Sequence, residues 1–389
     1  MRTDIALLFA TRAMRMFAYG AVSVVLVLYL AGVGIGAQRI GLLLTLTLIG
    51  DVIVSLFLTT RADRLGRRRT LIAGAILMAA AAAVFAMTHD FWLLLIAATI
   101  GVISPSGNEV GPFLAVEQVA LADAAPNRDR THLYAWYNLG GSFATALGAL
   151  TAGAVTERLS YQTVILGYGV IGVIMAVVFT RLSSAVDAQH HETAGFLSVQ
   201  KSRGVVAKLS GLFAIDSFAG GLVVQSILAW WFYRRFGLTP ATLGAIFFGA
   251  NVLAGVSALA ASSLARRFGL LNTMVFTHLP SNILLLLVPF MPNLGLTITV
   301  LLLRFSISQM DVPTRQSYVM AVVDPAERTA AAGITGVART TGAALAPLLA
   351  VPLVGSTHDW VPFVAAGGLK VVYDLLLLRS FRHLSAANQ

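Results

Sequence analysis

Long apolar blocks alternate with short polar segments along nearly the whole chain. The blocks run for about 18 to 28 residues, and an α-helix needs about 20 residues at 1.5 Å each to cross a hydrocarbon layer about 30 Å thick. The pattern therefore predicts an all-α, polytopic membrane protein. Its twelve expected transmembrane helices lie near residues 5–31, 40–60, 70–88, 91–121, 132–155, 161–181, 206–233, 241–264, 272–291, 294–320, 329–354 and 360–379.

The longest polar stretch of the chain divides the expected helices into six and six. It spans residues 183–204 and reads SSAVDAQHHETAGFLSVQKSRG. We therefore predict an N-terminal six-helix bundle over residues 1–182, a cytoplasmic linker over 183–204 and a C-terminal six-helix bundle over 205–389.

The two halves also repeat weakly. A shift of 203 residues lays ADRLGRRRTL at 62–71 on ARRFGLLNTM at 265–274. A shift of 202 lays Glu109 on Asp311. Matches at nearly one offset, close to half the chain length, predict two pseudo-symmetric bundles, an architecture typical of secondary transporters.

Composition narrows the class of protein further. Hydrophobic residues make up 57% of the chain and charged residues only 11%, against roughly 25% in soluble domains, and the mean hydropathy is +0.82. The net charge of +10 has no soluble basic domain to carry it, so we expect no nucleic-acid partner. The chain has no cysteine, which excludes disulfides, thiolate metal sites and a cysteine nucleophile. The first apolar block is too long for a signal peptide, so we expect it to remain a membrane helix.

The placement of Lys and Arg predicts the orientation in the membrane. Most basic residues outside the apolar blocks lie on the side of the termini and the linker, whereas the other side has only Arg39, Arg158, Arg234 and Arg235. Basic residues are enriched in cytoplasmic loops. We therefore expect a multi-pass protein of the plasma (inner) membrane with both termini in the cytoplasm.

The segment TTRADRLGRR, residues 59–68, is the most charged turn of the chain. Its charge is sufficient to hold this loop in the cytoplasm. With the twelve expected helices and the long central linker, it also resembles the major facilitator superfamily, whose motif in this loop is G-x-L-A-D-R-x-G-R-R. Thr59 and Arg61 stand where the family has glycine and leucine.

The resemblance covers essentially the whole chain and implies the family's transporter fold. It also implies that this motif forms a cytoplasmic gate. Asp63 would face the positive end of a helix in the other half, and Gly66 would permit the tight turn. Arg64, Arg67 and Arg68 would hold carboxylates or lipid phosphates.

Ionisable residues within the apolar blocks are candidates for the pathway of substrate and protons. Each would cost about 2.5–3.5 kcal/mol at a lipid-exposed helix centre, so most must face the protein interior. Arg15 and Asp216 each lie ten residues into an expected span, about 15 Å deep, and could form an ion pair or contact substrate. Arg12, one turn nearer the cytoplasm, is expected to extend to the membrane surface.

Glu109 lies in SPSGNEVGP, residues 104–112, where two prolines and two glycines are expected to interrupt the helix. Such breaks occur at transporter binding sites. Because no base lies within one turn of Glu109 on its own helix, we predict that Glu109 exchanges protons, with Asp216 as the next candidate. Glu117, nearer the cytoplasm, is expected at the gate.

Several further polar residues are candidates. Asp311 and Arg315 are spaced i,i+4 and could neutralise each other or contact substrate. Lys370 and Asp374 have the same spacing and are expected to form a structural pair. The side chains that could line the pathway, or only bond neighbouring helices, are Tyr19, Asn108, Gln225 and Arg339.

The sequence carries no signature of an enzyme. It has no H-E-x-x-H, no G-x-S-x-G and no phosphate-binding G-x-x-x-x-G-K-[ST], so we expect neither catalysis, nor ATP, nor a cofactor or metal. We predict a monomeric secondary active transporter that moves a small solute across the lipid bilayer, coupled to protons, with efflux favoured over uptake. Two alternatives stay open: a facilitative uniporter or exchanger for metabolites or organic anions, and a non-transporting receptor on the same fold.

Overall fold

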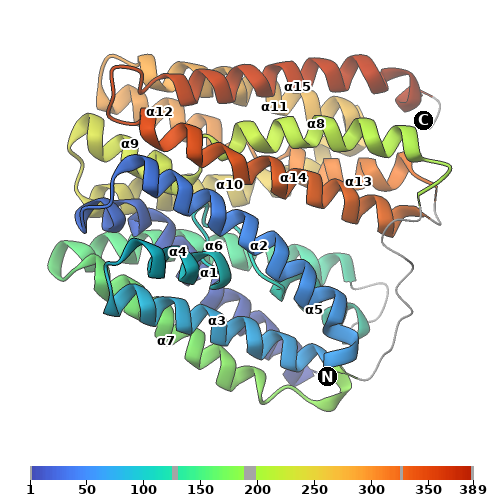
Figure 1. The fold of residues 1–389 in the computed structure, drawn as a ribbon. Coiled ribbons are helices and arrows are strands. Elements are labelled where there is room, and N and C mark those ends of the chain that lie inside the picture. Colours follow the sequence, from blue (N-terminus) through green and yellow to red (C-terminus); the bar gives the residue numbers. More distant parts are fainter. Residues whose placement is uncertain (1, 125–129, 188–198, 325–326, 387–389) are drawn as a thin grey trace. The chain divides into compact units, whose positions relative to one another are not determined.

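The computed structural model describes residues 2–124, 130–187, 199–324 and 327–386, and within these ranges the regular structure is entirely helical. Figure 1 shows the arrangement. Short 3-10 turns lie at Ser184–Val186, Val288–Phe290 and Val351–Leu353. The α-helices are α1 (Arg2–Gly32), α2 (Ala37–Leu65), α3 (Arg67–Met87), α4 (Phe91–Ile100), α5 (Phe113–Ala124), α6 (Arg130–Arg158), α7 (Tyr161–Phe179), α8 (Arg203–Gly221), α9 (Gln225–Phe236), α10 (Pro240–Phe268), α11 (Leu270–Leu287), α12 (Leu294–Phe305), α13 (Asp311–Val322), α14 (Arg328–Ala350) and α15 (Val361–Ala386).

Three expected spans consist of two helices each: α4 with α5, α8 with α9, and α12 with α13. When each pair is counted once, the described helices agree with the twelve predicted spans. Among the described residues, ten candidate spans are long and apolar enough to cross a membrane. The two remaining apolar helices, α4 and α12, are too short to do so alone and are the first halves of broken spans.

Local signals explain where several helices begin. Asp90 caps α4 by accepting hydrogen bonds from the Trp92 and Leu93 amides, and Asn293 caps α12 through the Leu296 amide. Between α2 and α3, Gly66 adopts a φ of 93°, which a residue with a side chain rarely tolerates. The tight turn expected at this glycine is therefore present.

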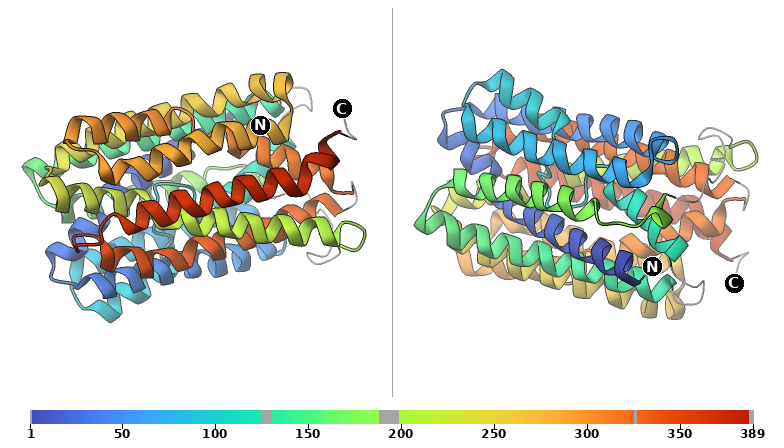
Figure 2. Two further views of the ribbon diagram at one scale, coloured as in Figure 1. Left: turned by 90° about the horizontal axis from the view of Figure 1, so that it is seen from above. Right: turned by 90° about the horizontal axis from the view of Figure 1, so that it is seen from below.

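The chain divides into two compact units. The first consists of Met1–His191 with Val224–Gly249, and the second of Glu192–Val223 with Ala250–Gln389. Within the first unit, α1 packs against α6, α7 and α9, and α3 packs against α7. Within the second, α8 lies beside α14 and α15 (Figure 2). The division into two six-helix bundles at residues 183–204 stays a prediction, and residues 188–198 of this linker lie outside the described ranges.

Close backbone contact joins α1 to α6. A Cβ atom added to Gly148 would lie 1.9 Å from the carbonyl oxygen of Phe17. At Gly140, on the same helix, an added Cβ would meet no atom within 4 Å. Small residues at such crossings allow membrane helices to approach closely, so Gly148 sets the distance between α1 and α6.

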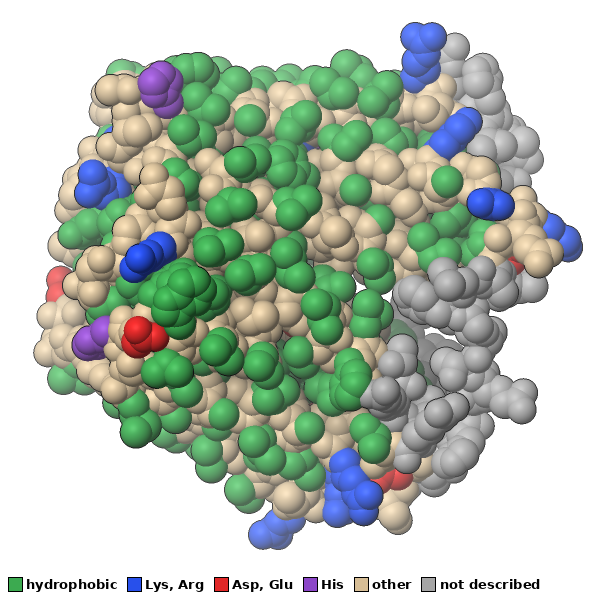
Figure 3. All heavy atoms as spheres, in the orientation of Figure 1, with side chains coloured by type: hydrophobic (Ala, Val, Ile, Leu, Met, Phe, Trp, Pro, Cys, Tyr) green, Lys and Arg blue, Asp and Glu red, His purple; other side chains and the backbone are tan. Residues whose placement is uncertain are grey.

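Large hydrophobic side chains lie on the outside of the helices. On α7, for example, Leu166, Val170, Val173 and Val177 are each at least half exposed. Figure 3 shows hydrophobic side chains over much of one face, with Lys and Arg near its margins. This distribution suits helices surrounded by lipid rather than water.

In the second unit, Glu327 fixes the beginning of α8. Its buried carboxylate accepts hydrogen bonds from the backbone amides of Gln200, Lys201 and Ser202, at 2.7, 2.8 and 2.9 Å. These hydrogen bonds, that of Gln200 foremost, lower the pKa of Glu327 to about 2. The negative charge therefore persists at the positive end of α8.

Candidate functional site

The interruption predicted around Glu109 is confirmed. Residues 101–112 connect α4 to α5 without helical structure, and Val102 adopts a positive φ of 56°. Backbone carbonyls released by the break find other donors: the Tyr168 hydroxyl bonds the Val102 carbonyl at 2.7 Å. The segment therefore places polar backbone groups at the depth of the membrane and supplies them with hydrogen-bond partners.

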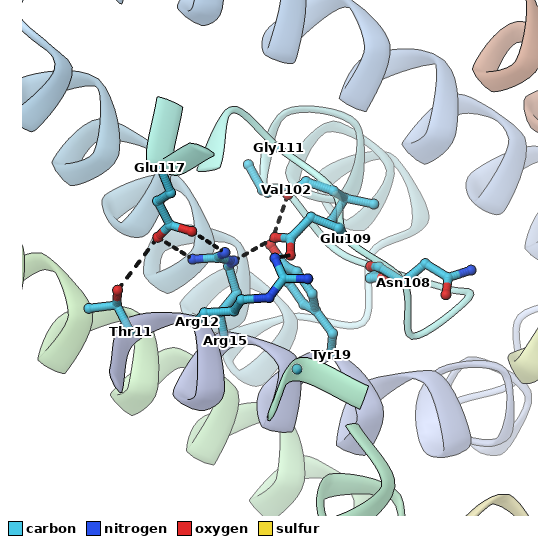
Figure 4. Close-up of polar contacts among 12 residues, drawn as sticks. Thr11, Arg12, Arg15, Tyr19, Val102, Asn108, Glu109, Gly111 and Glu117 are labelled. Atoms are coloured by element: carbon cyan, nitrogen blue, oxygen red, sulfur yellow. Dashed lines mark hydrogen bonds and ion pairs between the residues drawn. The ribbon is translucent and has the colours of Figure 1, made fainter. Parts of the chain in front are cut away.

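Two arginines of α1 meet two glutamates at this break. Arg15 Nε lies 2.6 Å from Glu109 Oε1, and Arg15 Nη1 and Nη2 lie 2.9 and 2.7 Å from the two carboxylate oxygens of Glu117. Arg12 Nη1 lies 2.7 Å from Glu109 Oε2. Figure 4 shows Glu117 and Glu109 approaching the guanidinium groups from opposite sides.

We call Arg12, Arg15, Glu109 and Glu117 the span 4 cluster, because both glutamates lie in the fourth expected span, formed by α4 and α5. Further contacts surround it. Glu117 and Arg15 are fully buried, and Glu117 also accepts hydrogen bonds from the hydroxyls of Thr11 and Tyr137. The guanidinium of Arg15 stacks 4.4 Å from the centre of the Phe113 ring. Two positive charges against two negative ones make the cluster neutral, which is how buried ion pairs are tolerated.

One expectation about these residues was wrong. Arg12 does not extend to the membrane surface; it is buried and bonds Glu109 and the Tyr137 carbonyl, at 3.0 Å. No base lies within one turn of Glu109 along the chain, as predicted, but both arginines reach it from α1. Glu117 belongs to the same cluster, and its gate role stays a prediction. The sequence signal for these pairings was weak, since the partners lie about 100 residues apart.

Asp51 is a half-buried acid that was not among the predicted pathway residues. It lies on α2, where it accepts a hydrogen bond from the Gly111 amide at 2.5 Å and one from the Ser55 hydroxyl at 3.2 Å. No basic side chain bonds it among the described residues. Its one sequence signal was that it is the only ionisable residue within the apolar block at residues 40–60.

The other three predicted pathway residues of the first unit are Tyr19, Asn108 and Gln225. Tyr19 is fully buried and donates to the Val110 carbonyl at 3.2 Å, beside the break. Asn108 is exposed and points away from the arginines in Figure 4. Gln225, at the start of α9, donates to the Ser23 hydroxyl at 2.8 Å. Tyr19 thus bonds the residue that directly follows Glu109.

A second group of charges, the Asp216 cluster, lies within the second unit. Asp216 Oδ1 is 2.5 Å from Lys370 Nζ, and Asp216 Oδ2 is 3.1 Å from Arg315 Nη1. Arg315 also pairs with Asp311 at 3.1 Å, as their i,i+4 spacing predicted. Asp216 thus has its partners on α11, α13 and α15, and Arg15 has its partners in the first unit.

The expected pair of Lys370 with Asp374 was wrong. Lys370 bonds Asp216, while Asp374 lies 2.8 Å from His278 Nδ1 and accepts a hydrogen bond from Asn282 at 2.9 Å. His278 Nε2 in turn lies 3.7 Å from Asp216. An imidazole therefore connects two carboxylates that the sequence did not associate.

Two arginines of the second unit stand apart from these pairs. Arg304 on α12 and Arg339 on α14 form no hydrogen bond or ion pair with the described residues, and the Nε atom of each is buried without a partner. Arg339 was a predicted pathway residue, whereas Arg304 was not. No group of three His, Cys, Asp or Glu side chains in the described ranges is arranged to hold a metal ion.

The motif between α2 and α3 is described only in part. Arg67 Nη1 and Arg68 Nη1 donate to the carbonyls of Val186 and Leu182, both at 3.3 Å, and the Arg68 amide donates to Asp187 at 3.0 Å. These guanidinium contacts are to carbonyls that follow α7, one of them in the 3-10 turn Ser184–Val186, and the predicted contacts to carboxylates or lipid phosphates stay a prediction. The side chains of Asp63 and Arg64 lie outside the described part of the structure, and the gate role of the motif stays a prediction.

Known proteins resemble the chain in sequence and in fold. The family model described as Major Facilitator Superfamily matches residues 8–347. The uncharacterized membrane protein YJR124C of Saccharomyces cerevisiae is 31% identical over 425 aligned residues, covering 98% of this chain and 95% of that protein. Quinolone resistance protein NorA of Staphylococcus aureus is 26% identical over 185 residues, covering 46% of this chain and 45% of NorA. A structure of the nucleoside transporter NupG superposes with a TM-score of 0.77 at 14% identity, covering 98% of this chain and 100% of that one.

Proposed function

Because the chain belongs to the Major Facilitator Superfamily, we propose that it is a proton-coupled secondary transporter that exports a small solute from the cell. The observation that carries the proposal is the charged cluster of the first unit beside a broken helix. Buried charges and unwound backbone at membrane depth are the features with which transporters bind polar solutes and ions.

Asp51 is the acid that we assign to the proton. Glu109 and Glu117 are held by guanidinium groups, and Asp216 is held by Lys370 and Arg315. A proton that binds any of these three carboxylates must displace a cation. Asp51 has only neutral hydrogen-bond donors, so it can bind and release a proton without leaving a buried base unpaired. Protonation would also weaken its hold on the Gly111 amide and so release the break in span 4.

The solute must first be identified by measuring flux. Purified protein in liposomes is tested with radiolabelled metabolites and drugs, beginning with a quinolone and a nucleoside, the compounds named in the two transporters above. A solute that accumulates only when a pH gradient is imposed supports the proposal. Flux that is insensitive to the pH gradient would instead indicate a facilitative carrier, and the absence of flux for every solute would favour a receptor.

We expect Asp51→Asn to lose accumulation driven by the pH gradient while retaining exchange of solute across the liposome membrane. Asparagine cannot carry the proton, but it can still accept the Gly111 hydrogen bond, so the fold is preserved. The measurement is the steady-state ratio of internal to external solute, which should fall to about one, its value at equilibrium. Glu157→Gln, an exposed acid at the end of α6, is the matched control and should accumulate solute normally. Normal accumulation by Asp51→Asn would place the proton site elsewhere.

We also propose that both termini face the cytoplasm of the plasma membrane. The chain lacks cysteine, so single cysteines can be introduced without background. Lys201→Cys, before α8, should be protected from a membrane-impermeant maleimide in intact cells. His358→Cys, between α14 and α15, should react. Both side chains are exposed, so the reverse pattern of labelling would overturn the orientation.

A further inference from the structure

We propose that Arg304 and Arg339 form a binding site for an anionic group of the transported solute: a carboxylate, sulfonate or phosphate. The inference rests on the proposed transport function and names the class of solute. It begins from the two buried Nε atoms without partners. A buried donor that is left unsatisfied is costly, and most such groups in native proteins have a partner.

Neither arginine can reach the membrane surface. Arg304 lies ten residues after the start of α12, and Arg339 lies eleven residues after the start of α14. At 1.5 Å per residue both are roughly 15 Å deep, near the middle of a hydrocarbon layer about 30 Å thick. An arginine side chain extends only about 6–7 Å, so extension to the interface cannot hydrate these guanidinium groups.

The charges of the Asp216 cluster do not neutralise Arg304 and Arg339. The bonded groups of the Asp216 cluster are Asp216, Asp311, Asp374, Arg315, Lys370 and His278. Even with the histidine protonated, its three bases only balance its three acids. The two remaining arginines therefore leave an excess of two positive charges, or of one if the histidine is neutral. The span 4 cluster, by contrast, is neutral within itself.

Both guanidinium groups belong to the second unit, on α12 and α14. The nearest candidate carboxylates of that unit already have other partners: Asp216 bonds Lys370 and Arg315, and Asp311 bonds Arg315. Arg304 additionally lies 4.9 Å from the centre of the Phe305 ring, a cation–π contact that does not neutralise its charge.

The chemistry of the missing partner follows from these donors. Guanidinium groups bind carboxylate, sulfonate and phosphate oxygens through charge-assisted hydrogen bonds, in fixed planar geometry. A neutral solute would leave the excess charge unbalanced, and a cationic solute would increase it. The site therefore selects for an anion.

The test is binding to the purified, full-length protein in lipid nanodiscs. Benzoate, benzenesulfonate and phenyl phosphate are compared with benzamide and benzylammonium, which have the same ring without the negative charge. At least one anion should raise the unfolding temperature, while benzamide and benzylammonium should not. Arg304→Gln and Arg339→Gln should each weaken that anion's apparent affinity about tenfold or more. Arg266→Gln, at the exposed end of α10, should leave it unchanged.

A merely structural role is distinguished by the protein without ligand. Since neither arginine has a hydrogen-bond or ion-pair partner in the described part of the chain, both glutamine variants should unfold without ligand at the wild-type temperature or above it. If a glutamine variant fails to fold, Arg304→Lys and Arg339→Lys keep the charge and should retain part of the anion effect. Equal stabilisation by benzamide, no stabilisation by any of the three anions, or full anion binding by both glutamine variants would each overturn the site. Anion binding without flux in liposomes would preserve the site and overturn the transport function.

Discussion

Arg15→Met is expected to lower the free energy of unfolding by about 3–5 kcal/mol. Methionine has a similar length but leaves Glu117 fully buried with only the Thr11 and Tyr137 hydroxyls as donors. It also removes one of the two bases that hold Glu109. Breaking one side of a buried ion pair is far more damaging than losing an exposed one, because the remaining charge has no water to solvate it. Thermal unfolding of the purified variant in detergent measures the loss.

A second substitution separates charge from packing at this position. Arg15→Met combined with Glu117→Gln removes one charge of each sign and should recover most of the lost stability. Arg158→Met, at the exposed end of α6, is the control and should change the unfolding free energy by less than about 0.5 kcal/mol. If Arg15→Met were as stable as this control, the ion pairs of the span 4 cluster would not be stabilising the fold.

Gly148→Val should separate α1 from α6 and destabilise the first unit by about 1–3 kcal/mol or more. The reason is geometric: the nearest atom to a new Cβ is a backbone oxygen at 1.9 Å, which cannot rotate away as a side chain could. Helix displacement would also pull the arginines of α1 away from Glu117. Unfolding temperature and the fraction of monodisperse protein on size-exclusion chromatography report the effect.

Gly140→Val provides the matched comparison for Gly148→Val. Both positions lie on α6 and receive the same side chain, so the helix propensity lost is similar in each variant. An added Cβ at Gly140 meets no neighbouring atom within 4 Å. Only the tight contact therefore distinguishes them, and equal stability of the two variants would show that α1 and α6 are not held at this distance.

The spans and the first break could be predicted because their signals are local. Hydropathy over about 20 residues locates a membrane helix without knowledge of its neighbours, and two prolines with two glycines at 104–112 are enough to interrupt one. The break after Gly220 and Gly221 was not predicted, although this pair of glycines was the available signal. It differs from the first break in having no proline.

The ion pairs could not be predicted in the same way, because their partners are set by three-dimensional packing. Spacing of i,i+4 correctly paired Asp311 with Arg315, but it wrongly paired Lys370 with Asp374. Spacing along one helix shows only that two side chains can meet. A carboxylate on another helix, here Asp216, was closer to Lys370. Asp51 was overlooked for the same reason, since its isolation becomes informative only when every other acid within the expected spans is seen to have a base.

The neutral span 4 cluster has a consequence for the order in which the chain is made. Arg12 and Arg15 emerge from the ribosome about 100 residues before Glu109 and Glu117, an interval of about 5–20 s at typical rates of translation. During that interval α1 carries two arginines whose exposure to lipid would cost about 5–7 kcal/mol in total. The first helix must therefore wait at the insertion machinery, or beside water, until the fourth segment arrives to neutralise it.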